Sequence, residues 1–340
     1  MNKIYKKSLL LIFSLIIIVI IIESSFYVYK PKISNLKPNS HTFHSTTDIM
    51  QMFEFNSLMT DPFITNSDGF RDYEYTKIKD SNIYRIIMLG DSVVFGYNLE
   101  NLSQTIPKKL EYKLLNSSNE TTYEVLNMGV YTYNSVQELH FFINKGLKYD
   151  PDLLIIGYFL NDPEWVESSL YPYLAPTKRK IYEQNLLALL PKHCSLEHNM
   201  KKSFFGKLIL SIFKKNILRF DSPNYFSYIT NDPCQFGLVE HSFNSFKQLS
   251  DTYGFNVLVV IFPYFTESSS ELAELQIIHY KITNLSLNNN FYVLDLYNLS
   301  KENYYGEITI NRDRTHYNNF GTEVVSNIML EYLQKNNILS

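Results

Sequence analysis

A serine that follows a predicted strand is the first residue of this chain that could act as a nucleophile. It lies in Gly90-Asp91-Ser92, directly after the apolar run Tyr84–Leu89. A serine at a strand-to-helix turn exposes its hydroxyl and directs its backbone N–H into the space beside it. The tripeptide alone is weak evidence, because Asp and Ser also cap helices in turns without a catalytic role. Ser92 becomes informative only together with a base and hydrogen-bond donors.

A matching base is predicted near the C-terminus. Asp313 and His316 are three positions apart, in a loop before the last predicted helix. A carboxylate at this spacing can accept the imidazole Nδ1–H, which orients the ring and leaves Nε2 free as a base. The alternative interpretation is a surface histidine, with Asn318 or Asn319 capping the helix that follows.

Two further strand ends supply candidate donors for an oxyanion. Gly129 follows the second predicted strand, and a glycine allows the backbone to approach a ligand closely. Asn161 follows the third and offers a side-chain amide N–H. Each is also typical of an ordinary turn. Together with Ser92 and His316, however, they make a nucleophile, a base and two donors at four strand-end loops, which is a complete set for acyl transfer.

The elements that must position these residues are short apolar strands that alternate with amphipathic helices. The predicted strands are Tyr84–Leu89, Tyr123–Asn127, Leu153–Gly157, Asn256–Phe262 and Phe291–Leu296. The predicted helices are Pro107–Leu115, Val136–Lys145, Val239–Tyr253, Glu271–Leu285 and Asn318–Gln334. This alternation predicts an α/β fold with a parallel sheet covered on both faces, whose sites form at the carboxyl ends of the strands.

From Tyr84 to the last helix, the chain resembles the SGNH (GDSL-like) hydrolase superfamily. The four sequence blocks of that family match here as Gly90-Asp91-Ser92, Gly129, Asn161-Asp162 and Asp313-x-x-His316. In the third block Phe159 stands where the family usually has glycine. The segments Asn66–Asp72 and Tyr123–Asn127 resemble a bacterial, membrane-anchored branch.

The resemblance implies a flavodoxin-like three-layer α/β/α sandwich with about five parallel strands and no cofactor. It also implies a catalytic triad of Ser92, His316 and Asp313, with Ser92, Gly129 and Asn161 forming the oxyanion hole. The expected activity is a serine esterase or deacylase acting on an acylated glycan or a lipid. Two alternatives stay open: an O-acyltransferase that modifies an envelope polysaccharide, and an inactive relative that binds glycans or partner proteins.

The first thirty residues are predicted to form one transmembrane helix that anchors the protein. Lys3, Lys6 and Lys7 precede the apolar run Ser8–Tyr29, which as a helix is long enough to cross a hydrocarbon core of roughly 30 Å. The lysine cluster favours a cytoplasmic N-terminus, so the catalytic domain is expected outside the cytoplasmic membrane. A cleaved signal peptide is the rival, although Glu23–Phe26 matches a cleavage site poorly. Residues 31–80 are interpreted as a stalk and approach segment, and 81–340 as the hydrolase-like domain.

Residues 163–238 interrupt the alternation and are predicted to form a lid-like insertion. Within it, 200–220 carries lysines and apolar residues at helical spacing, which is typical either of a helix on an anionic membrane or of a lid helix with its lysines in water. Cys194 and Cys234 could pair or stay free. His193, Cys194 and His198 lie close together, but without an evident fourth ligand we expect no metal site.

The composition of the chain excludes several other classes of protein. Of the 340 residues 45% are hydrophobic and 19% are charged, and the net charge is -3. The chain is too apolar to be disordered, and too weakly basic for a general nucleic-acid binder. With 2 Cys it is no disulfide scaffold.

Overall fold

The computed structural model describes Ser14 and residues 42–60, 63–117, 121–164, 176–201, 232–301, 306–310 and 313–339. The chain forms two compact units. One comprises Met1–Leu36 and Leu187–Pro223, and its described part contains helix α6 (Lys192–Lys201). The other comprises Lys37–Leu186 and Asn224–Ser340 and contains the sheet and all four candidate strand-end loops.

The larger unit is built on a five-stranded sheet in which every neighbouring pair of strands is parallel, as predicted. The strands are β3 (Ile83–Gly90), β4 (Thr122–Gly129), β5 (Leu153–Tyr158), β6 (Asn256–Ile261) and β7 (Tyr292–Asp295). Their order across the sheet is β4-β3-β5-β6-β7. Counted along the chain this is 2-1-3-4-5, the order of flavodoxin-like sheets, which places the ligand-binding switch point between β3 and β5.

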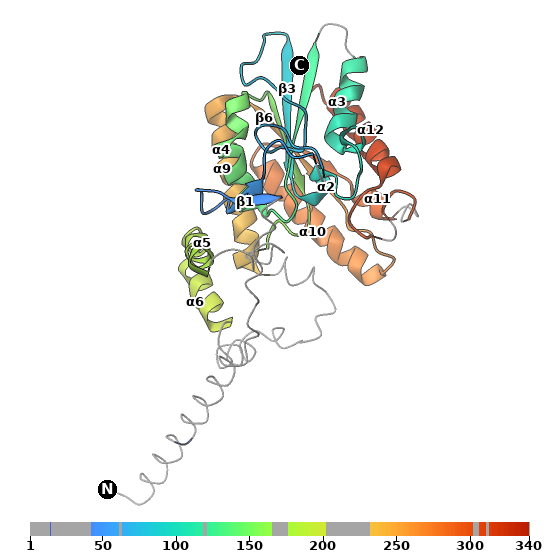
Figure 1. The fold of residues 1–340 in the computed structure, drawn as a ribbon. Helices are drawn as coiled ribbons and strands as arrows, with labels where there is room; N and C mark the ends of the chain where they lie inside the picture. Colours follow the sequence, from blue (N-terminus) through green and yellow to red (C-terminus); the bar gives the residue numbers. More distant parts are fainter. Residues whose placement is uncertain are drawn as a thin grey trace, which may run out of the picture. The chain divides into compact units, whose positions relative to one another are not determined.

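Helices cover both faces of this sheet (Figure 1). On one face α3 (Ile106–Ser117) packs against α12 (Asn319–Lys335), and on the other α4 (Ser135–Asn144) packs against α9 (Pro233–Tyr253). Helix α10 (Ser269–Asn288) packs against β7. Because both faces are covered, the central strands are almost wholly apolar and buried.

One predicted boundary was wrong. Helix α9 begins at Pro233, within the expected insertion 163–238, and not at Val239. Asp232 caps it by accepting the Cys234 N–H, and a proline at the first helical position suits the helical φ angle. The described part of the insertion also contains α5 (Pro176–Ala188) and α6. The remaining short elements are η1 (Leu102–Gln104), η2 (Gly146–Tyr149) and α11 (Tyr297–Lys301).

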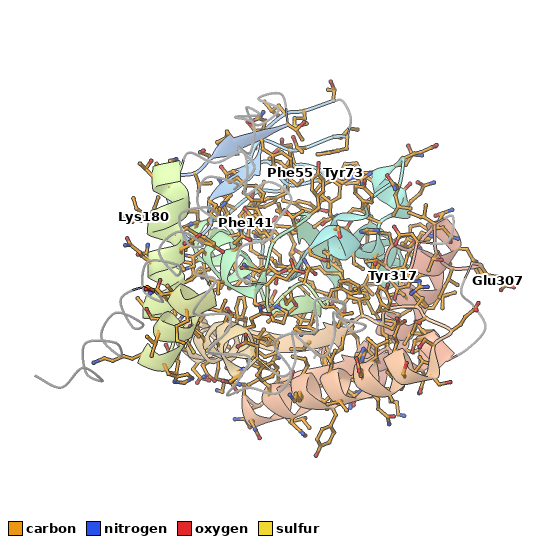
Figure 2. The ribbon with its side chains drawn as sticks, turned by 90° about the horizontal axis from the view of Figure 1, so that it is seen from below. Phe55, Tyr73, Phe141, Lys180, Glu307 and Tyr317 are labelled. Atoms are coloured by element: carbon orange, nitrogen blue, oxygen red, sulfur yellow. The ribbon has the colours of Figure 1, made fainter. Side chains whose placement is uncertain are left out.

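Part of the segment interpreted as a stalk packs into the larger unit. Strands β1 (Phe43–Ser45) and β2 (Phe53–Phe55) form an antiparallel hairpin whose inward rings, Phe53 and Phe55, are buried. Phe55, which is labelled in Figure 2, stacks edge-on or tilted against the rings of Phe63, Phe95 and Tyr131. The hairpin therefore contributes to the core beside the loops that follow β3 and β4.

The predicted membrane anchor and the basic segment, for which a membrane surface or a lid was expected, lie largely outside the described residues. These are the anchor at residues 8–29, of which only Ser14 is described, and the basic segment 200–220, of which only Met200 and Lys201 are described. Among the described residues, none of the helices combines the length and the apolar character that a membrane crossing requires.

Candidate active site

The candidate nucleophile begins a very short helix at the carboxyl end of β3. Helix α2 comprises Ser92–Phe95, and Asp91 precedes it as the N-cap, with its carboxylate accepting the Val93 N–H at 2.8 Å. Gly96 ends the helix in the left-handed region, with φ +82°. Ser92 is partly exposed, whereas Asp91 and Val93–Phe95 are buried. The turn thus presents the serine at the sheet edge while its neighbours anchor it in the core.

Three glycines allow α2 to lie directly on the strand ends. Gly90, Gly129 and Gly157 are register partners in three adjacent strands, β3, β4 and β5. A Cβ at Gly90 or Gly157 would come within 2.4 or 2.5 Å of Val94 Cγ2. A Cβ at Gly129 would come within 2.2 Å of the Phe95 backbone nitrogen. This row of glycines, called the glycine shelf below, allows close contact between α2 and the strand ends and so sets the distance of Ser92 from the sheet.

The structure brings Ser92, His316 and Asp313 together. His316 Nε2 lies 2.8 Å from Ser92 Oγ, across a separation of 224 positions in the chain. His316 Nδ1 lies 2.6 Å from Asp313 Oδ2. The backbone supports this arrangement, because Asp313 Oδ1 also accepts the N–H groups of Thr315 at 2.8 Å and His316 at 3.2 Å. The sequence spacing therefore becomes one hydrogen-bonded chain of serine, histidine and carboxylate.

Electrostatics set the direction of these hydrogen bonds. Burial acts to raise the pKa of Asp313, but the His316 hydrogen bond and charge and the two backbone N–H groups outweigh it, so the pKa lies below its ordinary value. Asp313 is then an ionised acceptor near neutral pH, and His316 Nδ1 must carry the hydrogen of the bond between them. His316 Nε2 is left as an acceptor for the Ser92 hydroxyl.

The ring of Tyr97 is a further neighbour of the base. It packs on the His316 imidazole with a centroid separation of 4.7 Å. The Tyr97 N–H donates to the Ser92 carbonyl at 3.0 Å, so the same residue contacts both Ser92 and His316. Sequence reasoning did not identify Tyr97, because an aromatic residue five positions beyond a helix start carries no functional signal by itself.

The two predicted oxyanion donors occupy the expected strand ends but are hydrogen-bonded elsewhere. The Gly129 N–H donates to Asn127 Oδ1 at 3.0 Å, so an oxyanion would have to displace the Asn127 side chain to use it. The Asn161 amide donates to the Tyr133 carbonyl at 3.0 Å and hydrogen-bonds the Asp91 carboxyl. Asn161 thus lies beside the residue that caps the nucleophile's helix. Gly129 contributes through its missing side chain, as part of the glycine shelf.

The loop after β4 contains a backbone strain that the sequence does not reveal. Thr132 has φ +70°, a region that β-branched residues rarely adopt. Its Oγ1 is buried and has no hydrogen-bond partner among the described residues. Strained residues of this kind cluster at functional sites. No residue type or spacing could have pointed to Thr132, since threonine is not the residue expected at a positive φ.

Three buried carboxyl groups lie behind the nucleophile. Asp91, Asp162 and Glu138 are all 1% exposed or less. Burial, followed by the charges of the neighbouring acids, raises the pKa of Asp162 and Glu138 far above their ordinary values. Both oxygens of Glu138 lack a hydrogen-bond partner in the described part of the chain. Asp162 instead accepts the Phe159 N–H at 3.1 Å, which holds the loop that carries Asn161. Glu138, on α4, was not identified from the sequence.

The cysteines do not offer metal ligands. Both Cys194 and Cys234 are disulfide-bonded, so neither presents the thiolate that a metal site would use. Without a Cys194 thiolate, only two histidines remain of the three residues considered in the sequence, and two histidines fall short of the three or four protein ligands of zinc sites.

Comparisons with known proteins are confined to solved structures. No protein-family model matches the chain, and no curated protein matches it. The chain is similar to a putative lipolytic protein of the G-D-S-L family from Desulfitobacterium hafniense, with 13% identity and a TM-score of 0.44 over 73% of this chain and 99% of that one. It is similar to a lipase/acylhydrolase from Enterococcus faecalis, with 13% identity and a TM-score of 0.43; the match covers 74% of this chain and 96% of that one. It is also similar to the acetyl xylan esterase AlAXEase, with 15% identity and a TM-score of 0.42; the match covers 73% of this chain and 98% of that one.

Proposed function

We propose that this chain is a serine ester hydrolase of the SGNH (GDSL-like) type. One observation carries the proposal: Ser92 Oγ, His316 and Asp313 form a continuous hydrogen-bonded chain at 2.8 and 2.6 Å. A serine, an imidazole and a carboxylate in this order constitute the nucleophile, base and orienting group of acyl-transfer enzymes. Their position beside the switch point of a parallel sheet is where such sheets bind ligands.

The proposed reaction proceeds through an acyl-enzyme. Ser92 Oγ attacks the ester carbonyl carbon while His316 Nε2 takes the hydroxyl proton, and the Asp313 carboxylate stabilises the imidazolium that forms. The tetrahedral intermediate then collapses, the ester C–O bond breaks, and His316 returns the proton to the departing alkoxide. Water, deprotonated by the same imidazole, then attacks the acyl-serine; the bond between the acyl carbon and Ser92 Oγ breaks, His316 returns the proton to Oγ, and the acid is released.

The oxyanion of the intermediate needs donors on the side of Ser92 that faces away from His316. We propose the Ser92 backbone N–H and the Asn161 amide, which lies next to the nucleophile's helix and would have to release one of its two hydrogen bonds, to the Tyr133 carbonyl or to Asp91. Gly129 is a third candidate, provided that its N–H is released from Asn127 Oδ1. Loss of one such donor costs about 10²–10³ in rate.

The proposed setting is the outer side of a membrane. The lysines before residues 8–29 favour a cytoplasmic N-terminus, and both cysteines are disulfide-bonded, a state that persists in oxidising compartments. We therefore propose an anchored protein whose larger unit meets acylated glycans or lipids of the envelope.

Covalent labelling tests the nucleophile directly. The full chain is treated with a fluorophosphonate probe, and hydrolysis of p-nitrophenyl acetate is measured in parallel. We expect labelling and hydrolysis in the parent protein and neither in Ser92→Ala. A Ser92→Ala protein that hydrolyses the ester at the parent rate would refute the assignment, and a parent protein that is folded but unreactive would indicate a binding protein instead.

The acceptor of the acyl group is tested by product analysis. The enzyme is incubated with acyl esters of increasing chain length, with and without a sugar acceptor. Free acid as the main product in both cases supports hydrolysis. An acylated sugar that forms at the expense of free acid would assign the same site to O-acyl transfer.

A further inference from the structure

The segment Asn66–Asp72, which the catalytic assignment leaves without a role, directs a buried arginine at the nucleophile's turn. Arg71 is 2% exposed. Its guanidinium donates to three backbone carbonyls that follow Ser92, those of Phe95 at 3.2 Å, Gly96 and Leu99. The group is also held by aromatic rings, with its central carbon 4.8 Å from the centroid of Phe95 and 5.9 Å from that of Phe63.

These carbonyls belong to the turn that connects the nucleophile to the base. The N–H groups of Gly96 and Tyr97 donate to the Ser92 carbonyl at 3.1 and 3.0 Å. The Tyr97 ring then packs on the His316 imidazole. A displacement of the turn would therefore move Ser92 through its own carbonyl and His316 through the ring that packs on it.

The helix α2 is held by side-chain hydrogen bonds at its two ends. Asp91 accepts the Val93 N–H at the N-terminal end, and Arg71 donates to the carbonyls at the C-terminal end. Burial lowers the pKa of Arg71 to about 10, which still leaves it charged at neutral pH.

We propose that Arg71 is a positioning residue that fixes the turn Phe95–Leu99 and thereby the geometry of the Ser92–His316 pair. The inference rests on the proposed ester hydrolysis. It assigns to Arg71 no contact with substrate, so the residue would act on the turnover step and not on substrate binding. A misplacement of about 1 Å between reacting groups can cost 10²-fold in rate.

Arg71→Ala is the primary variant, tested in the full chain with p-nitrophenyl acetate. We expect kcat to fall about 10- to 100-fold while KM changes less than twofold, because only the alignment of the reacting pair is lost. Guanidinium chloride at about 50 mM, far below the molar concentrations that unfold proteins, should raise the kcat of Arg71→Ala several-fold by occupying the site that the arginine leaves empty. The same concentration of sodium chloride should restore nothing.

A matched control is available in Arg85, a second buried arginine, which donates to Glu124 and to the Tyr149 carbonyl and contacts none of the catalytic residues. Arg85→Ala is expected to lower thermal stability, but its kcat per folded molecule should stay within about twofold of the parent and should not respond to guanidinium. Equal rescue of Arg85→Ala would show a general salt effect and would overturn the inference.

Arg71→Lys keeps the test decisive if Arg71→Ala does not fold. Lysine retains the charge, but a single ammonium cannot reproduce the planar fork that serves three carbonyls, so kcat should again fall. A folded Arg71→Lys or Arg71→Ala protein with the parent kcat overturns the inference, as does failure of both variants to fold. If the parent protein itself neither hydrolyses esters nor reacts with the fluorophosphonate, the proposed function fails instead.

Discussion

At the residue scale, the pairing of His316 with Asp313 distinguishes this histidine from a surface residue. The carboxylate accepts three N–H groups, and this network keeps its pKa below the ordinary value although burial acts in the opposite direction. Asp313 therefore stays ionised throughout the range in which an imidazole base operates. An ionised partner determines which ring nitrogen carries the hydrogen and which one faces Ser92.

This argument predicts a large effect from a small change. Asp313→Asn should lower kcat by about 10³–10⁴, because the amide can present a donor to Nδ1 and favour the wrong tautomer. The measurement is kcat for p-nitrophenyl acetate at neutral pH.

The chain provides a matched control for this prediction. The buried His279 and the more exposed Asp295 form another histidine–carboxylate pair, also at 2.6 Å. Asp295→Asn breaks an equivalent hydrogen bond away from Ser92 and should leave kcat unchanged. An equal loss in both variants would mean that the effect comes from stability and not from the tautomer.

At the element scale, the glycine shelf explains why a four-residue helix can hold a nucleophile. A helix this short has little stability of its own. Its position comes from contact with the ends of β3, β4 and β5, where Gly90, Gly129 and Gly157 leave no side chain in the way. The three positions are not equivalent, because the added Cβ would meet a side chain in two cases and backbone in the third.

Alanine substitutions should reveal that difference. Gly129→Ala should abolish labelling of Ser92 and destabilise the protein by about 1–3 kcal/mol or more, since the Phe95 backbone cannot yield without moving α2. Gly90→Ala should be milder and should be partly rescued by Val94→Ala, which removes the methyl group in the way. Thermal melts and fluorophosphonate labelling measure both effects. Rescue of Gly129→Ala by Val94→Ala would contradict the backbone origin of the clash.

Helix α4 carries the second consequence at this scale, through Glu138. A buried acid with a raised pKa binds its proton more tightly in the folded protein than in the unfolded chain. Stability therefore falls as pH rises above the unfolded value of about 4.3 and continues to fall up to the folded pKa. Asp162 follows the same rule for the same reason.

Glu138→Gln removes this pH dependence while keeping the shape of the side chain. We expect the variant to melt at a higher temperature than the parent at pH 8, by about 2–4 °C for each kcal/mol regained, and the difference to shrink toward pH 5. Thermal melts at pH 5, 6.5 and 8 test this. A difference that is constant with pH would show that Glu138 does not hold a proton in the folded protein.

At the scale of the whole molecule, the sequence predicted the sheet and the order of its site loops but not what supports them. Three of the five apolar runs are followed by residues that suit catalysis, and such a pattern is visible without coordinates. Arg71, Thr132 and Glu138 escaped prediction for physical reasons. Arg71 donates to backbone carbonyls, which every residue possesses, and Glu138 lies on a helix face that the sequence cannot orient toward Ser92.

The anchor predicted for residues 8–29 is testable on the intact protein. The full chain should remain in the membrane fraction after alkaline carbonate washing, while a variant with Leu10, Leu11 and Ile16 replaced by lysine should be released. Release of the parent protein by carbonate would contradict the anchor, and detection of a shortened mature chain would instead support a cleaved signal peptide.

The separation of Ser92 and His316 along the chain has a consequence for biosynthesis. Domains fold progressively as the chain emerges, beginning from the N-terminus. The nucleophile, its helix and the glycine shelf are complete once β5 has been made, but the base and the carboxylate arrive only with the residues just before α12. A nascent or C-terminally truncated chain therefore holds an unactivated serine. The proposed esterase activity would appear only at the end of translation, when the final helix docks against α3.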